Sequence, residues 1–343
     1  MNIQTSYSWS RREFLRTLCI VGGAGLLGIQ PTSAAADPPP ETTTIRLIRE
    51  TKFAILCYAP QYIAEELLRA EGFTDVQYVP KGVKGSEANA LLQDNADMSS
   101  ALGVDWIMPI ASKQPVVVLA GLHAGCIELF ASHQVRSIRE LKGKRLAVNG
   151  LEAPERYLLA SVAAYIGLDP DRDIEWVFST PNEWAKLLVD NKVDAILTFP
   201  PLNYHLHDNK IGHVILNTTT DNPWRHYFCC MVGARRDFVE KYPVATKRAL
   251  RALLKANQLC SLDPPRMARW LVDGGQASNY EYALRTLQDI PYDAWRDYDP
   301  VDTLRFYSLR LREAKLMQDT PQQILDRGTD WRFFNELKKE LKA

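Results

Sequence analysis

Apolar and polar positions along the chain predict strands and helices that follow one another. Short apolar runs bounded by turn residues occur at Ile45–Ile48, Val76–Val79 and Val116–Ala120, and the segments between them have helical spacing. This βαβαβ order predicts sequential parallel strands with helices packed against them. After Ala234 the pattern is helical up to the last residues, so we expect a helical C-terminal extension.

One stretch of this pattern occurs twice. Residues Leu187–Pro201 read as a helix end, an Asp-Asn turn, a buried strand Val193–Leu197 and a loop that ends in two prolines. The segment Leu91–Gly103 has the same Leu-Leu-x-Asp-Asn start, then a turn, an aspartate, a strand and a loop. Two such αβ units predict two α/β lobes whose strand ends face each other.

Two apolar segments, Cys126–Ala131 and Tyr227–Val232, are expected to connect the lobes. We assign residues 45–125 and 233–343 to lobe I and residues 126–232 to lobe II, with residues 37–44 as a linker. Lobes joined by two crossing strands form a hinge and close around ligands. The predicted fold class is therefore α/β, with two lobes, two hinge strands and the helical extension.

The N-terminus carries a targeting pattern. Ser10–Arg16, Ser-Arg-Arg-Glu-Phe-Leu-Arg, resembles the twin-arginine export motif, an apolar run follows, and Ala34-Ala35-Ala36 supplies a cleavage site. We predict a signal peptide cleaved after Ala36, the twin-arginine (Tat) translocase as partner during export, and a periplasmic protein. The alternative is an ordinary secretion signal with a fortuitous arginine pair. Twin-arginine export carries folded proteins, which is compatible with a cofactor loaded in the cytoplasm and equally with fast folding.

Composition excludes several classes of function. The chain has 343 residues, 46% of them hydrophobic and 24% charged, and its formal net charge is zero. That length suits two domains, and the absence of net positive charge argues against nucleic-acid binding. The five cysteines after Ala36 are odd in number and lack a CxxC pair, so a disulfide framework is not expected, although one pair could form.

Three segments carry a family resemblance. They are the start of the second lobe at Ser137–Val148, the Val193-Asp194-Ala195 strand with its proline-bearing loop, and the return Arg235–Pro243. Together they resemble the solute-binding proteins of nitrate/sulfonate/taurine-type ABC importers, which share their fold with thiamine-pyrimidine precursor binding proteins. The resemblance implies a type II periplasmic-binding-protein fold, no enzymatic activity, a monomer, and ABC permease and ATPase subunits as partners. It implies capture of a small organic solute: a sulfonate, a carboxylate or a pyrimidine-like heteroaromatic compound. An enzyme of the same fold and a ligand-sensing module remain the alternatives.

The candidate ligand-binding residues are those that follow strands in either lobe or lie near a crossing. They are Lys52, Phe53, Leu102, Gly103, His123, Gly150, Glu152, Thr198, Phe199, Trp224 and His226. Residues Asn149–Glu155 precede a helix whose free N–H groups would attract an anion, but Glu152 beside them argues against a simple inorganic anion.

For one cluster, His226 with Cys229 and Cys230, the alternative to solute binding is a metal site. Alternation along the returning strand would point Trp224, His226, Phe228 and Cys230 one way, and adjacent cysteines would then face opposite sides. We therefore predict no metal and no cofactor. The loop Lys81–Lys84 and the pair His205 and His207 are expected to be solvated.

Overall fold

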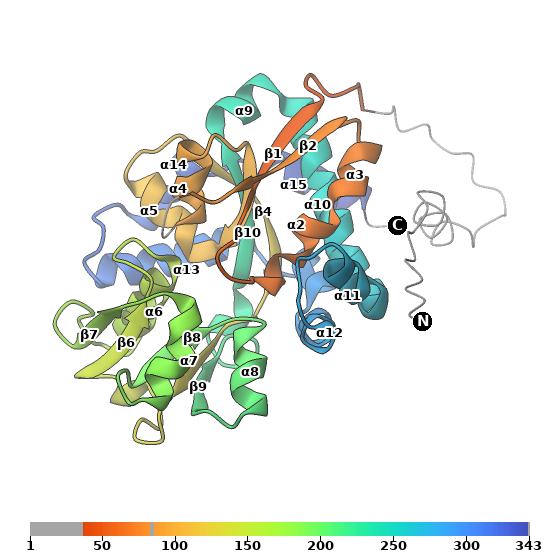
Figure 1. Ribbon diagram of the computed structural model, residues 1–343. Coiled ribbons are helices and arrows are strands. Elements are labelled where there is room, and N and C mark those ends of the chain that lie inside the picture. Colours follow the sequence, from red (N-terminus) through yellow and green to blue (C-terminus); the bar gives the residue numbers. More distant parts are fainter. Residues whose placement is uncertain (1–36, 83–85, 342–343) are drawn as a thin grey trace, which may run out of the picture. The chain divides into compact units, whose positions relative to one another are not determined.

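The structure is a computed structural model that describes residues 37–82 and 86–341 (Figure 1). The predicted signal peptide and its cleavage after Ala36 lie outside these residues. From Pro39 onwards the chain forms one unit built on two five-stranded sheets. We call the body around the first sheet lobe I and the body around the second sheet lobe II.

The sheet of lobe I has the order β2-β1-β3-β10-β4. Its strands are β1 (Thr44–Arg49), β2 (Asp75–Pro80), β3 (Met98–Leu102), β4 (Val116–Ala124) and β10 (Phe228–Arg235). Strand β1 runs parallel to β2 and β3, as the sequence pattern predicts. The returning strand β10 lies between β3 and β4 and is antiparallel to both, so the expected run of sequential parallel strands stops at β3.

The first helices of lobe I are short. They are η1 (Leu56–Tyr58), α2 (Ala59–Ile63), α3 (Glu65–Ala70), α4 (Glu87–Gln93), η2 (Gly103–Trp106) and α5 (Ile107–Ala111). The segment of helical spacing between the first two apolar runs is divided into η1, α2 and α3. The hydroxyl of Tyr78 donates to the carbonyl oxygens of Gln61 at 2.9 Å and Tyr62 at 3.4 Å, which satisfies backbone acceptors where the helix is interrupted.

The sheet of lobe II repeats this topology with the order β7-β6-β8-β5-β9. Strand β6 is parallel to β7 and β8, and β5 is antiparallel to β8 and β9. The strands are β5 (Glu128–Ala131), β6 (Lys144–Val148), β7 (Ile174–Phe178), β8 (Ala195–Thr198) and β9 (His213–Asn217). The helices are η3 (Ile138–Glu140), α6 (Pro154–Tyr165), α7 (Pro181–Val189), α8 (Leu202–Asp208) and η4 (Trp224–His226).

The repeated stretch noted in the sequence has the same structure in both lobes. Asn95 and Asn191 end the two helices with a φ of 54° each. Asp97 then accepts from the backbone N–H and the guanidinium of Arg46 at 2.9, 3.1 and 2.8 Å, and Asp194 accepts from Arg145 at 2.8, 3.1 and 2.8 Å. Each aspartate thus ties its strand to the neighbouring parallel strand, β1 in lobe I and β6 in lobe II. Strand β8 begins directly after Asp194, at Ala195 rather than at the expected Val193.

The chain passes between the lobes twice, from β4 to β5 and from β9 to β10 (Figure 1). The two connections are hydrogen-bonded to each other. Cys126 and Ile127 donate their backbone N–H groups to the hydroxyls of Thr219 and Thr218, each at 3.1 Å. Gly125 has a φ of +69°, and a Cβ there would lie 2.4 Å from the Thr219 hydroxyl, so only glycine fits between the two connections.

The chain ends in the predicted helical extension. Its helices are α9 (Arg236–Lys241), α10 (Pro243–Leu262), α11 (Pro264–Asp273), α12 (Tyr280–Asp289), η5 (Tyr292–Arg296), α13 (Pro300–Glu313), α14 (Pro321–Gly328) and α15 (Arg332–Glu340). Helix α10 packs on α2 and α3 of lobe I, whereas α13 packs on α6 of lobe II as well as on η2 of lobe I. The extension therefore contacts both lobes.

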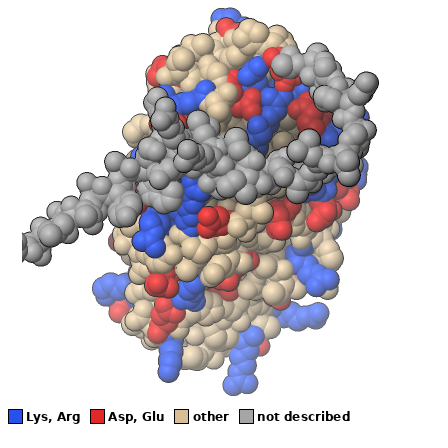
Figure 2. Space-filling view, turned by 90° about the vertical axis from the view of Figure 1, so that its right-hand side faces the viewer, with Lys and Arg blue, Asp and Glu red and all other residues tan. Residues whose placement is uncertain are grey.

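Each lobe has its own apolar core. In lobe II it includes Phe130, Trp184, Leu188 and Ile196, all nearly inaccessible to solvent. On the face shown in Figure 2, acidic and basic side chains are interspersed, as expected for zero net charge. Across the described ranges 37–82 and 86–341, none of the helices combines the length and the apolar character that crossing a membrane requires.

Candidate functional site

A cavity lies between the lobes, at the ends of strands from both sheets. Lobe I contributes Phe53, Ile55, Cys57, Tyr58, Lys81, Glu87 and Leu102, and lobe II contributes Asn149, Pro154, Glu155, Pro181, Trp184 and Phe199. Its volume is about 30 Å³, enough for water but too small for an organic solute. The lobes are therefore closed in this structure, and a compound larger than water could enter only if they separate.

Buried charges form the lobe I wall of the cavity. The ammonium of Lys81 lies 2.8 Å from Glu87 and 3.6 Å from Glu50, and all three side chains are almost inaccessible to solvent. Burial lowers the pKa of Lys81, but the two carboxylates outweigh it and raise the pKa above its ordinary value. Lys81 is therefore a buried cation, not part of a solvated loop as the sequence analysis expected.

Asp105 belongs to η2, and its carboxyl group lies against the start of helix α4, which carries Glu87. One carboxyl oxygen accepts from the backbone N–H groups of Glu87 at 2.9 Å and Ala88 at 3.3 Å. The other oxygen is buried without a hydrogen-bond partner among the described residues. Burial, and then repulsion by Glu87, raise the pKa of Asp105 to about 8, which favours the neutral acid at neutral pH.

Glu155 is the acidic group of the lobe II wall. It stands in the first turn of α6, and its carboxylate accepts from the backbone N–H of Asn149 at 2.5 Å. Burial raises the pKa of Glu155 to about 7, against the opposing effect of that backbone N–H. The cavity is thus lined by one buried cation, Lys81, and two carboxyl groups, Glu87 and Glu155, an environment that disfavours an inorganic anion.

Contacts across the gap hold the lobes together. The backbone N–H of Leu56 donates to the carbonyl of Pro200 at 3.0 Å, and the side-chain amide of Asn182 donates to the carbonyl of Lys52 at 3.2 Å. The rings of Phe53 and Phe199 lie with their centroids 6.2 Å apart and their planes tilted by 40°. Closure therefore brings together the two aromatic side chains that the sequence analysis had placed on opposite lobes.

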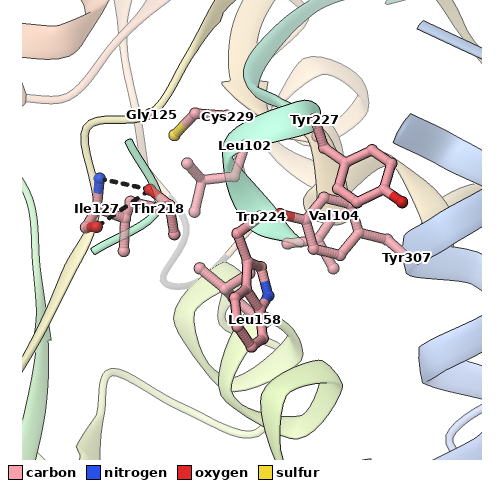
Figure 3. A pocket seen from close by; sticks show the side chains of 11 residues that line it. Leu102, Val104, Gly125, Ile127, Leu158, Thr218, Trp224, Tyr227, Cys229 and Tyr307 are labelled. Atoms are coloured by element: carbon pink, nitrogen blue, oxygen red, sulfur yellow. Dashed lines mark hydrogen bonds between the residues drawn. The ribbon is translucent and has the colours of Figure 1, made fainter. Parts of the chain in front are cut away.

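A second, smaller cavity of about 10 Å³ lies beside the hinge (Figure 3). Its lining is Leu102, Gly103, Val104, Gly125, Ile127, Leu158, Thr218, Trp224, Tyr227, Cys229 and Tyr307. Trp224 is only 2% exposed and meets the ring of Tyr165 edge-on at 5.1 Å. It comes from η4 and not from a strand, so the alternation expected over Trp224–Cys230 does not exist.

The predicted binding residues divide into two groups. Phe53, Leu102 and Phe199 line the cavity between the lobes, and Leu102, Gly103 and Trp224 line the cavity beside the hinge. Lys52 and Phe53 also line a hollow of about 300 Å³ on lobe I, together with Tyr62 and Gln276. The remaining candidates line neither of the first two cavities. They are Lys52 and Glu152, which are exposed, Gly150, which is half-buried, His226, which is exposed and bonded to Asn222 at 2.9 Å, and the fully buried Thr198 and His123.

Several residues that line the cavity were not among the predicted binding residues, above all Lys81, Glu87 and Glu155. Lys81 directly follows β2, and Glu87 and Glu155 each stand in the first turn of a helix. The rule that ligands bind beyond the carboxyl ends of strands could have indicated Lys81. The burial of Glu87 and Glu155 depends on lobe closure and tertiary packing, which local sequence does not encode.

Comparison with known proteins gives this geometry a context. The profile of the NMT1-like family matches residues 113–272. The chain is 25% identical over 261 residues to the nitrate/nitrite binding protein NrtA of Nostoc sp., covering 66% of this chain and 56% of that protein. It is 25% identical over 305 residues to the bicarbonate-binding protein CmpA of Synechococcus elongatus, covering 73% and 65%.

The crystal structure of the periplasmic nitrate-binding protein NrtA from Synechocystis PCC 6803 superimposes with a TM-score of 0.72. The alignment covers 89% of this chain and 90% of that one at 16% identity. The matches to the two curated relatives span less than two thirds of their length. The predicted fold is confirmed: the chain is a two-lobed α/β protein with the fold of the periplasmic binding proteins, and its residues 113–272 match the NMT1-like family.

Proposed function

We propose that this protein is the periplasmic substrate-binding component of an ABC importer. It captures a small organic solute between its lobes and presents the closed form to a permease driven by an ATPase. The observation that carries the proposal is the cavity lined from both lobes and closed by the Leu56–Pro200 bond. Relatives that bind nitrate, nitrite or bicarbonate by name support a binding role without chemical turnover.

The cavity's chemistry favours the heteroaromatic, pyrimidine-like class among the expected solutes. Phe53 and Phe199 offer ring faces on opposite lobes, which suits a flat ligand stacked between them. Glu87 and Glu155 offer carboxyl oxygens, which accept hydrogen bonds from ring N–H and amino groups. A sulfonate or nitrate would find a single ammonium, Lys81, already paired with Glu87 and Glu50.

Calorimetry with the mature protein tests both the role and the ligand class. The panel consists of aminopyrimidines, aromatic amines, alkanesulfonates, carboxylates, nitrate and bicarbonate. We expect saturable binding of a donor-bearing heteroaromatic compound and negligible heat with nitrate. Tight nitrate or sulfonate binding would overturn the ligand class, and product formation from any bound compound would overturn the non-enzymatic role.

The variant Glu155→Gln tests the assignment of the cavity itself. It retains the shape of the side chain but removes its charge, so binding of an amino-bearing ligand should weaken about tenfold, equivalent to roughly 1.4 kcal/mol. The matched control is Glu152→Gln, three positions earlier in the same segment, whose exposed side chain lies outside the cavity. Equal loss of affinity in both variants would contradict a ligand site at Glu155.

A further inference from the structure

Four sulfur- or nitrogen-bearing side chains meet behind the cavity, at the hinge. They are Cys57 of η1, His123 of β4, Cys126 of the first connection and Cys230 of β10. Their ligand atoms all lie within 4.8 Å of one another, and all four side chains are buried. His123 and Cys126 lie three residues apart, whereas Cys57 and Cys230 come from distant segments, so folding assembles the group from three parts of the chain.

His123 is oriented as a metal ligand would be. Its Nδ1 lies 3.3 Å from the carbonyl oxygen of Ala124, which accepts a hydrogen bond from it and leaves the lone pair of Nε2 free. Nε2 is buried and has no hydrogen-bond partner within the described parts of the chain. A backbone carbonyl that fixes the second ring nitrogen is the usual support of a metal-bound histidine.

Neighbouring side chains hold this orientation. The ring of Tyr292 meets that of His123 edge-on at 5.1 Å, and its hydroxyl donates to the carbonyl oxygen of Cys57 at 3.1 Å. The amide of Asn257 donates to the carbonyls of Leu122 and Tyr292 at 2.6 and 2.7 Å. The imidazole and the Cys57 backbone are thus fixed by one buried network.

The strand pattern predicted that the adjacent cysteines Cys229 and Cys230 face opposite sides. In the structure their side chains lie together instead. The pairing of β10 with β4 shifts register between Phe228 and Met231, which is a β-bulge or a comparable irregularity. The Sγ atoms of Cys229 and Cys230 consequently lie 4.0 Å apart, and Cys229 Sγ is 2.9 Å from Cys126 Sγ. Alternation along the strand therefore does not separate these two thiols, and a metal ion can be bound in this segment.

We propose that Cys57, His123, Cys126 and Cys230 bind one thiophilic transition-metal ion of the Zn²⁺ class through three thiolates and one imidazole. Tetrahedral zinc with Zn–S bonds of about 2.3 Å places its sulfurs roughly 3.8 Å apart, within the span of this group. Three thiolates select zinc-like ions over magnesium or calcium. Cys229 is a spare thiol beside the site.

Four protein ligands leave no open position, so the site is structural rather than catalytic. It joins lobe I at Cys57 to both hinge strands, and Cys57 also lines the solute cavity. The ion therefore sets the position of one cavity wall. Export in the folded state, as the twin-arginine motif predicts, would allow loading before the thiols meet an oxidising compartment.

Metal analysis of the full chain tests this proposal. We expect purified protein to contain one zinc ion per chain by elemental analysis, and Co²⁺ substitution to produce the charge-transfer absorption of thiolate–cobalt bonds. Cys57→Ser and Cys230→Ser should lose most of both signals. Cys260→Ser is the matched control, because Cys260 is equally buried in α10 but lies outside the group.

Two further measurements on the unmodified protein apply even where a variant fails to fold. A strong chelator should lower the melting temperature, and Zn²⁺ should restore it. Denatured, chelated protein should present five reactive thiols from the mature sequence. Loss of two thiols without bound metal would identify a Cys126–Cys229 disulfide and overturn the proposal, as would a cobalt spectrum that is unchanged in Cys57→Ser.

Discussion

The backbone N–H of Leu56 donates to the carbonyl oxygen of Pro200 across the gap between the lobes, at 3.0 Å. This bond joins η1 of lobe I to the loop after β8 of lobe II and closes the cavity on one side. A backbone bond cannot be deleted by changing a side chain, so its strength depends on the other contacts that hold the lobes closed. Apparent ligand affinity scales with the closed fraction, which makes those contacts determinants of affinity.

Arg285 provides the clearest test of closure. From α12 it pairs with Asp208 of α8 at 2.9 Å, and its guanidinium lies 4.3 Å from the ring of Tyr204. Arg285→Ala removes an ion pair and a cation–π contact between the lobes, together roughly 1 kcal/mol at a partly exposed position. We expect about a fivefold lower ratio of closed to open protein, seen as a larger radius of gyration in small-angle scattering.

Arg305→Ala is the control for this experiment. Arg305 pairs with Asp302 at 2.8 Å inside α13, so its loss removes an ion pair of similar exposure without affecting the lobe contact. The radius of gyration of this variant should match that of the unmodified protein. Equal expansion of both variants would show that Arg285 does not stabilise closure.

The stability of the protein should depend on pH through Glu155. Burial raises its pKa from 4.5 to about 7, so between these values the folded state holds a proton that the unfolded state has released. The free energy of unfolding must then fall as pH rises through this window, by at most about 3 kcal/mol. Urea unfolding between pH 5 and 8 measures this slope, and Glu155→Gln should reduce it.

Glu152→Gln should retain the full slope, since its side chain is exposed. In Glu155→Gln the free energy of unfolding should still fall with rising pH, and it should do so up to about pH 8, because burial also raises the pKa of Asp105 to about 8. A Glu155→Gln variant whose pH dependence matches that of the unmodified protein would contradict the burial of this carboxyl.

The sequence predicted most of the fold because the fold depends on local patterns. Strands β1, β2 and β4 include the predicted apolar runs Ile45–Ile48, Val76–Val79 and Val116–Ala120, and the repeated Asp-Asn turn correctly indicated two related lobes. The insertion of β10 between β3 and β4 was not predictable, because it pairs residues far apart in the chain. The register shift that brings Cys229 and Cys230 together is likewise a property of the sheet, not of the segment.

The candidate site was predictable only as a set of strand ends. Phe53, Leu102 and Phe199 were found by that rule. His123 was placed in the cleft because polar residues near a crossing are candidates, but it lies beside Cys126 and beside Cys57 and Cys230, two cysteines that are far from it in sequence. Lys81 was interpreted as solvated because lysine is rarely buried unless paired, and its partner Glu50 lies just after another strand, β1.

Truncation of Trp224 should lower the stability of the protein strongly, whereas truncation of His226 should hardly change it. Trp224 is 2% exposed and packs on Tyr165, so Trp224→Ala leaves a cavity beside the hinge and should cost roughly 3–4 kcal/mol of stability. His226 is exposed, so His226→Ala should change stability by less than about 0.5 kcal/mol. Urea denaturation followed by far-UV circular dichroism compares the two variants. A stable Trp224→Ala variant would show that the hinge packs differently in solution.

The paired clamps predict that each lobe can be weakened separately. The Asp97 side chain is 3% exposed and that of Asp194 is 15% exposed, and each aspartate accepts three hydrogen bonds from its arginine. Asp97→Ala should cost about 2–3 kcal/mol and Asp194→Ala about 1–2 kcal/mol, because the arginines are partly hydrated and recover some solvation. Hydrogen exchange should show lost protection in β1 and β3 for the first variant, and in β6 and β8 for the second.

Asp190→Ala is the matched control for these clamps, since Asp190 lies in the same turn as Asp194 but forms only an exposed pair with Lys186. It should change stability by less than about 0.5 kcal/mol.

Acid provides a second test for lobe II. The Arg145 hydrogen bonds hold the pKa of Asp194 below its ordinary 3.8, so its contribution is present above that pH and is lost as pH falls through the folded-state value. The difference between Asp194→Ala and the unmodified protein should therefore shrink in strong acid, whereas a constant difference would assign the loss to packing rather than to the ion pair.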